Sequence, residues 1–122
     1  MRGPRDQRER QRAERWGRMA EAIASAHMIA RGYRIEARNW RTASGEVDII
    51  ARRGDLVVFV EVKARDTVGA ALDAVSYASR RRIEGAGQDW LAQQPDGTSL
   101  SWRNDLIAVL PWSKPQHFED VW

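Results

Sequence analysis

Hydrophobic residues recur at helical spacing in two parts of the chain. Residues 5–31 contain no proline and are rich in Ala, Glu, Arg and Met, which favours a helix. The pattern predicts one long helix that ends at Gly32. Its second half carries apolar residues that we expect to pack on the core, namely Trp16, Met19, Ala20, Ile23 and Ala30. A second helix is predicted over about 70–93, with inward-facing Val75, Ile83, Ala86 and Trp90.

Four further segments have the β-branched, aromatic and alternating character of strands. They are residues 33–39, EVDIIA at 46–51, LVVFVEVKA at 56–64 and RNDLIAVL at 103–110. The resulting order along the chain is α-β-β-β-α-β. It predicts an α/β fold in which a mixed sheet is flanked by helices.

The second and third strands bring charged residues onto one face of a predicted hairpin. If Arg53 and Gly54 form a two-residue turn, paired positions sum to 107 and Asp48 lies opposite Phe59. Because side chains alternate between faces, four charged residues then share one face, namely Glu46, Asp48, Glu61 and Lys63. A register shift of one residue would move Asp48 to the other face.

This grouping favours a metal site. An unpaired charge inside such an apolar strand costs several kcal/mol unless it is paired, hydrogen-bonded or bound to a metal. Three acids and one lysine leave a net negative charge, which a divalent cation would neutralise. Mg²⁺ takes one or two carboxylates together with water and substrate phosphate, and Asp48 with Glu61 could supply the carboxylates. For Glu61 and Lys63 alone, the ordinary alternative is a solvated surface ion pair.

Length and composition fit a single soluble domain. The 122 residues suit one hydrophobic core, and no apolar run approaches the roughly 20 residues that cross a bilayer. The chain has no cysteine for a disulfide or a thiolate metal site. We therefore expect a cytoplasmic protein without membrane contact. Residues 14–122 are predicted to form the domain, preceded by a basic arm at 1–13 that is frayed or disordered.

The positive charge is unevenly distributed. The net charge is only +3, yet seven arginines crowd the first eighteen residues, and Arg80, Arg81 and Arg82 form a run. Such clusters suit a nucleic-acid backbone, although a solvated helix surface explains the first equally well. Lys63 stands out because the chain has eighteen arginines and only two lysines. A compact ammonium can approach a water or a scissile phosphate in a way that a guanidinium cannot.

An ordered series of motifs resembles the YraN-like bacterial family of proteins with an endonuclease-like fold. The motifs are Gly17 to Glu21, RGYRI at 31–35, Asn39, GEVDII at 45–50, FVEVKAR at 59–65 and RNDLIAV at 103–109. More broadly, a helix glutamate, a strand aspartate and E-x-K are similar to the PD-(D/E)xK superfamily with its restriction-endonuclease-like fold, and to archaeal-type Holliday-junction resolvases in particular. The resemblance extends from about residue 14 to the C-terminus.

The resemblance implies a role for each matching position. Asp48 and Glu61 would be metal ligands, Lys63 the catalytic lysine, and Glu21 a helix carboxylate that reaches the metal directly or through water. The chain departs from the family pattern at Ala20, where a glycine is common, and at Ser79, near which a lysine is common. Phosphate contacts are expected from Arg65 and from Arg80, Arg81 and Arg82.

Several other polar or aromatic residues have a more ordinary explanation. Glu46 is as readily an ion-pair partner of an arginine as a metal ligand. Arg103 and Asp105 share a strand face and are expected to pair with each other. His27 and His117 have no partner at metal-ligand spacing and are treated as structural. Trp40, expected in a loop, is a candidate for stacking on an exposed base.

The leading hypothesis is a Mg²⁺- or Mn²⁺-dependent endonuclease, that is, a phosphodiesterase acting on DNA, with branched or single-stranded DNA as candidate substrates. The alternative is a non-catalytic nucleic-acid-binding or DNA-processing accessory protein that retains the fold. A homodimer is compatible with both.

Overall fold

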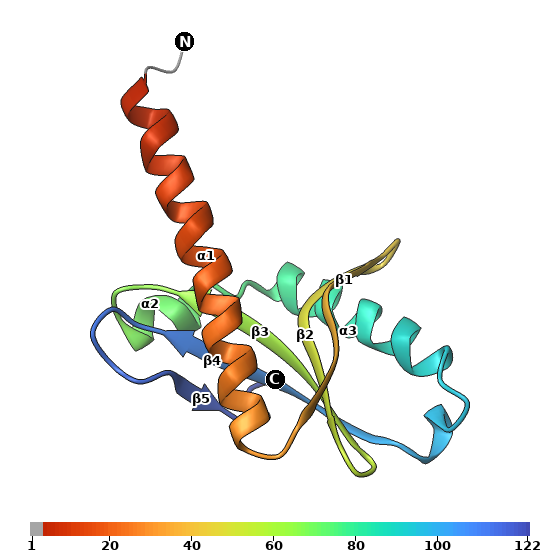
Figure 1. Cartoon of the computed structure of the whole chain (residues 1–122). Coiled ribbons are helices and arrows are strands. Elements are labelled where there is room, and N and C mark those ends of the chain that lie inside the picture. The colour runs from red at the N-terminus through yellow and green to blue at the C-terminus, as the bar shows by residue number, and fades with distance from the viewer. Residues whose placement is uncertain (1–3) are drawn as a thin grey trace.

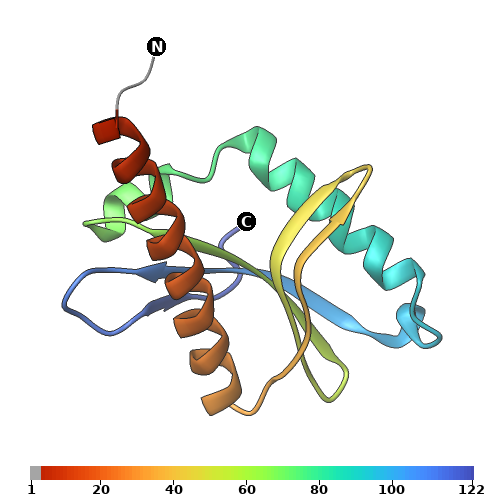
Figure 2. The same ribbon diagram turned by 45° about the horizontal axis from the view of Figure 1, so that its top comes forward.

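The computed structural model describes residues 4–122, with side chains from Asp6 onward, and begins with a single long helix. Helix α1 spans Pro4–Ala30, and its first half projects away from the rest of the molecule (Figures 1 and 2). The predicted arm at 1–13 is therefore helical from residue 4, while residues 1–3 lie outside the described part. The buried face of α1 is formed by Ala20, Ala24 and Met28. Met19 and Ala30 are exposed, so the predicted packing stripe is wrong at these two positions.

One mixed sheet forms the centre of the fold. Its strands are β1 (Arg34–Thr42), β2 (Gly45–Arg53), β3 (Leu56–Ala64), β4 (Ser101–Val109) and β5 (Gln116–Phe118), and they lie side by side in chain order. β3 and β4 run parallel, whereas the other neighbours are antiparallel. The mixed α/β fold expected from the sequence is confirmed, and the short edge strand β5 is an addition to it.

The predicted helix at 70–93 is two helices. α2 spans Val68–Asp73 and α3 spans Tyr77–Ala92. The chain breaks between them because Ser76 has an extended backbone and its hydroxyl accepts a hydrogen bond from the Ser79 N–H, which caps α3. The 3₁₀ helix η1 (Gly97–Ser99) then leads into β4. None of the helices in residues 4–122 is both long and apolar enough to cross a membrane.

The helices cover the two faces of the sheet separately. On one face, α1 packs over a cluster that includes Ile49, Val60 and Ile107. On the other, α3 packs over a cluster around Phe59, and the predicted inward residues Ile83, Ala86 and Trp90 are buried there. A side chain at Gly87 would crowd the Phe59 ring, so this glycine brings α3 close to the sheet. The core is thus two apolar layers separated by the sheet.

The β2–β3 register differs from the predicted one by two residues. Ile49 pairs with Val60 and Arg53 with Leu56, so paired positions sum to 109 and the turn is at Gly54 and Asp55. The predicted pairing of Asp48 with Phe59 is therefore wrong, because Phe59 pairs with Ile50. A shift of two residues keeps each side chain of the ladder from Ile49 to Arg53 on its expected face, but Asp48 lies beyond the end of this ladder.

Candidate active site

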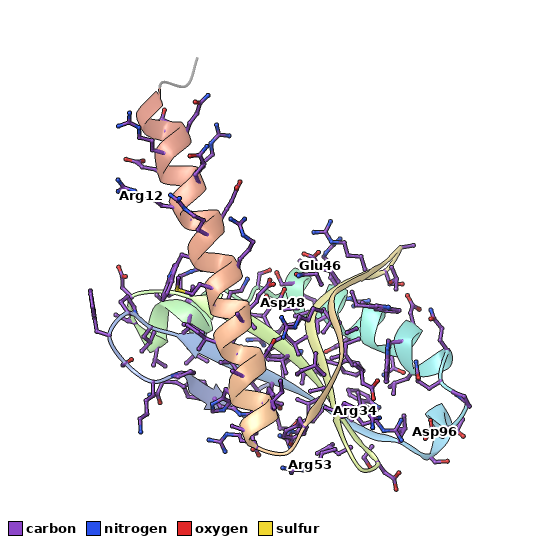
Figure 3. The ribbon with its side chains drawn as sticks, in the orientation of Figure 1. Arg12, Arg34, Glu46, Asp48, Arg53 and Asp96 are labelled. Atoms are coloured by element: carbon purple, nitrogen blue, oxygen red, sulfur yellow. The ribbon has the colours of Figure 1, made fainter. Side chains whose placement is uncertain are left out.

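The four residues singled out from the sequence line one cavity. It has a volume of about 300 Å³ and lies between the middle of α1 and the adjoining ends of β2 and β3. Glu21 comes from α1, Asp48 from β2, and Glu61 and Lys63 from β3, with Trp16, Gly17 and Ala20 forming the apolar wall. Figure 3 shows Glu46 and Asp48 where the β1–β2 hairpin passes beside α1.

Asp48 reaches the cavity because β2 separates from β3 at this point. The ladder between the two strands extends to Ile49 and Val60. Val47 and Ile50 are both buried on the α3 side, so the regular alternation of β2 is broken between them. The Asp48 carboxylate accepts a hydrogen bond of 2.8 Å from the Val62 N–H, in place of a backbone partner on β2. The local break therefore fixes the carboxylate to the neighbouring strand.

Asp48 and Glu61 form a close carboxylate pair. Asp48 is half-buried, and Glu61 is buried with 9% of its surface exposed. Burial raises the pKa of Asp48 to about 8, together with the charge and hydrogen bond of Glu61, while the Val62 N–H opposes the shift and Glu21 adds a smaller repulsion. Two acids held this close in a partly buried cavity favour a proton or a cation between them.

Lys63 supplies the cation nearest to this pair. Its Nζ lies 3.1 Å from Glu61 Oε1, with the two side chains 21% and 12% exposed. This low exposure argues against the solvated surface ion pair considered from the sequence. One ammonium beside the two carboxylates of Asp48 and Glu61 leaves the group with net negative charge when both acids are ionised.

Glu21 is tethered by a residue that the sequence interpretation did not include in the site. Asn39 Nδ2 donates a hydrogen bond of 3.0 Å to Glu21 Oε2. Asn39 has a positive φ of 49° within β1, and both it and Arg38 are exposed, so alternation is broken here too. A lone asparagine inside a strand was the available signal, because Asn is among the few residues that tolerate this backbone conformation.

The donor set fits a hard divalent cation held by two protein ligands. Among residues 4–122, no group of three or more His, Asp or Glu side chains is arranged to hold a metal ion. Mg²⁺ is commonly bound through one or two carboxylates and completes its shell with water and substrate phosphate. Asp48 and Glu61 match that demand, whereas Glu21 does not join them as a third ligand in this arrangement.

The other predicted contacts have mixed placements. Arg65 is exposed at the cavity rim, and Arg82 is exposed on α3. Arg80 is half-buried against the Trp122 ring, and Arg81 lies over Tyr77. The predicted loop position of Trp40 is wrong, since this residue belongs to β1 and packs against the cluster under α3. Glu46 forms an ion pair of 2.9 Å with Arg41, one of the two roles considered for it.

A second polar cluster lies outside the cavity. Asp105 pairs with Arg103 at 2.8 Å, as expected from the sequence, and also contacts His117 Nε2 at 2.7 Å. His117 Nδ1 lies 3.1 Å from His27 Nε2, so two histidines that are far apart in the sequence meet in the fold. The cluster joins α1, β4 and β5.

Comparisons with known proteins identify close relatives. The family described as "Uncharacterised protein family UPF0102" matches residues 20–109. A UPF0102 protein of Mesorhizobium japonicum is 53% identical over 92% of this chain and 90% of its own length. One from Rhizobium etli is 52% identical over 92% of each chain, and one from Agrobacterium fabrum is 46% identical over the same shares. The family match covers the positions of Glu21, Asp48, Glu61 and Lys63.

Proposed function

The chain belongs to the UPF0102 family, whose description states no activity, and from the geometry of the cavity we propose that it is a metal-dependent phosphodiesterase acting on DNA. The observation that carries the proposal is the half-buried carboxylate pair of Asp48 and Glu61 with Lys63 beside it. Burying two carboxylates that repel each other does not stabilise the fold, since two apolar residues would be more stable at these positions.

Each residue of the site has a distinct task in the proposed reaction. Asp48 and Glu61 hold Mg²⁺ or Mn²⁺, which when bound would lower the pKa of a water and stabilise charge on the phosphate. Lys63, kept in place by Glu61, is directed at the attacking water or at the phosphate oxygens. Glu21 accepts a proton or orients a water from the α1 side of the cavity. The apolar wall around Trp16 limits access of bulk water.

The charge distribution supports a nucleic acid as the substrate. Arg8, Arg12 and Arg15 follow one another at spacings of four and three residues, so they share one exposed face of α1. The acids Asp6 and Glu9 border a hollow on α1 together with Arg10 and Ala13. Arg65 adds a positive charge at the cavity rim. Exposed arginines on both the projecting helix and the rim suit a phosphate backbone that passes the site.

The test of this proposal is cleavage of end-labelled DNA, single-stranded and duplex, with Mg²⁺ or Mn²⁺. We expect metal-dependent cleavage that falls at least 100-fold in Asp48→Asn and Lys63→Met, in line with the loss of a metal ligand or of a charge-stabilising group. The chain offers a matched control, because its second lysine, Lys114, is exposed on the C-terminal tail. Lys114→Met should cleave like the natural chain. Equal activity in Lys63→Met and Lys114→Met would overturn the assignment.

A second candidate is a nucleic-acid-binding protein that does not cleave. It is favoured by the packing of Arg80 against Trp122, which removes one cation from the predicted phosphate contacts near Ser79. DNA binding that persists in Asp48→Asn, with no cleavage of any DNA by the natural chain in either metal, would support this candidate over the enzyme.

A further inference from the structure

Asn39 combines a left-handed backbone conformation with a side-chain hydrogen bond to Glu21. Its backbone has φ of +49° although it lies within a nine-residue strand. Gly, Asn and Asp are the residues that most readily adopt this left-handed conformation. Of these three, Asn alone carries a side-chain donor, and this donor is directed at a carboxylate, Glu21. An Asp at this position would repel Glu21, and a Gly would leave it free.

The surrounding strands put Asn39 beside the metal-binding pair. Arg38 pairs with Ile49 and Trp40 with Val47, so Asn39 lies level with Asp48 on the neighbouring strand. Alternation is broken at this level in both strands. The break directs Asp48 to the Val62 N–H and brings Asn39 within reach of α1. One irregularity in the hairpin thus serves both sides of the cavity.

The contact matters because Asn39 Nδ2 is the only hydrogen-bond donor to the Glu21 carboxylate among residues 6–122. Glu21 is half-buried on α1 and lines the cavity, and its charge is felt by Asp48. A glutamate side chain has three rotatable bonds, so an unrestrained carboxylate would populate several rotamers, some of them pointing into solvent. The Asn39 amide selects a rotamer in which Glu21 Oε2 is held 3.0 Å from Nδ2.

We propose that Asn39 is a positioning residue that holds the Glu21 carboxylate at the cavity so that Glu21 contributes to cation binding through water. This inference rests on the proposed function, because it assumes that the cavity binds a divalent cation through Asp48 and Glu61. Asn39 itself touches neither the cation nor the substrate. Its effect passes through Glu21, and this is the property that can be tested.

The experiment is a double-mutant cycle on Mn²⁺ affinity measured by calorimetry. The four proteins are the natural chain, Asn39→Gly, Glu21→Ala and the double variant. Glycine keeps the positive φ and removes the amide, so the fold should persist, which circular dichroism and thermal unfolding verify. We expect Asn39→Gly to weaken Mn²⁺ binding about tenfold, the lower end of the range for partners of metal-site groups. In the Glu21→Ala background the same substitution should change affinity less than twofold.

The outcomes separate the inference from the proposed function. Unchanged Mn²⁺ affinity in Asn39→Gly would overturn the positioning role while leaving the metal site in place. A tenfold loss in both backgrounds would also overturn it, since Asn39 would then act independently of Glu21. If the natural chain binds no Mn²⁺, or binds it as tightly after Asp48→Asn, the proposed function fails first and the inference fails with it.

Discussion

At the level of single residues, Asp48 is held where it costs stability. Its carboxyl is half-buried beside Glu61, and the pKa of about 8 means that the folded chain favours the protonated form. The Val62 N–H is its only hydrogen-bond donor among the contacts of the described residues. A carboxylate pair that lowers the stability of the fold is typical of a functional site.

Asp48→Asn is therefore expected to stabilise the metal-free protein, and increasingly so as pH rises. The folded pKa of about 8 lies above the ordinary value of 3.8, so the natural chain loses stability as pH rises from about 4 to 8. Asparagine still accepts from Val62 and carries no charge. The gain should be at least about 1 kcal/mol at pH 9, or at least roughly 4 °C in Tm, and absent at pH 4.

Thermal unfolding in the presence of a chelator measures this difference. Glu84→Gln, on the exposed side of α3, is the control and should show no such pH-dependent gain. Mn²⁺ should reverse the order at pH 8 by stabilising the natural chain alone. If Asp48→Asn were destabilised equally at pH 4 and pH 9, this would contradict the inference that the ionised Asp48 carboxylate lowers the stability of the natural chain.

The sequence predicted that Asp48, Glu61 and Lys63 come together, but it did so through a regular alternation that β2 does not keep. The carboxylate of Asp48 reaches the site through the break between Val47 and Ile50.

The register itself could not be predicted, since the RRGD segment allows a two-residue turn either at Arg53 and Gly54 or at Gly54 and Asp55. The role of Asn39 depends on a contact with α1, eighteen residues earlier, and local pattern gives no access to it.

Among the secondary-structure elements, α1 presents two different surfaces to its surroundings. One side of its second half packs on the sheet and carries Glu21 into the cavity. Its first half is exposed on all sides from residue 6 to residue 15 and is in contact with solvent (Figure 1). Arg8 and Arg12 belong to the arginine face described above, whereas Arg10 shares a surface with Asp6 and Glu9.

Exchanging two arginines on this face should weaken DNA binding more than exchanging two elsewhere on the same helix. Arg8→Gln with Arg12→Gln removes two charges from the arginine face of α1, and we expect the slope of log affinity against log salt to fall by about 2. Arg10→Gln with Arg18→Gln is the matched control, with an expected change below 1. Fluorescence anisotropy with labelled DNA between 50 and 200 mM salt measures both. Equal slopes for the two pairs would mean that only overall charge matters.

Element types were predictable where the composition is distinctive. α1 has no proline between residues 5 and 30 and is rich in helix formers, and β2 and β3 are rich in β-branched residues. The break between α2 and α3 was missed because Val75 and Ile83 fit the apolar stripe of one continuous helix. The Ser76 hydroxyl instead caps the start of α3, and such a cap stabilises a helix start by an amount comparable to the cost of interrupting the helix. β5 was missed because its three residues, Gln116 to Phe118, are too few for a period. It forms by pairing with β4, which is a tertiary effect.

For the molecule as a whole, Asp105 adds a polar connection between α1, β4 and β5 to their apolar packing. It is fully buried and accepts hydrogen bonds from Arg103, His117 and the Asp120 N–H. His117 continues the connection to His27 on α1, whose pKa is lowered by burial and by the neighbouring charges of Arg31 and His117. The helix that carries Glu21 is thereby tied to β4 and β5.

Asp105→Asn should accordingly destabilise the whole fold, by about 3 kcal/mol or more at pH 7. It leaves the largely buried Arg103 with only the exposed Glu119, 3.4 Å away, as an anionic partner. Burial raises the pKa of Asp105, but the hydrogen bonds from His117 and Arg103 outweigh it and hold the pKa below its ordinary value. The ionised carboxylate therefore contributes stability above about pH 4 that is lost as pH falls through the folded pKa. Urea unfolding should show a much lower free energy of unfolding for the variant than for the natural chain at pH 7, and this difference should narrow toward pH 3.

The control is Asp96→Asn, which breaks a more exposed pair with Arg52 and should cost under about 1 kcal/mol. If both variants lost the same small amount, α1 would be held by its apolar face alone, and the polar connection from Asp105 to His27 would have no part in placing the site.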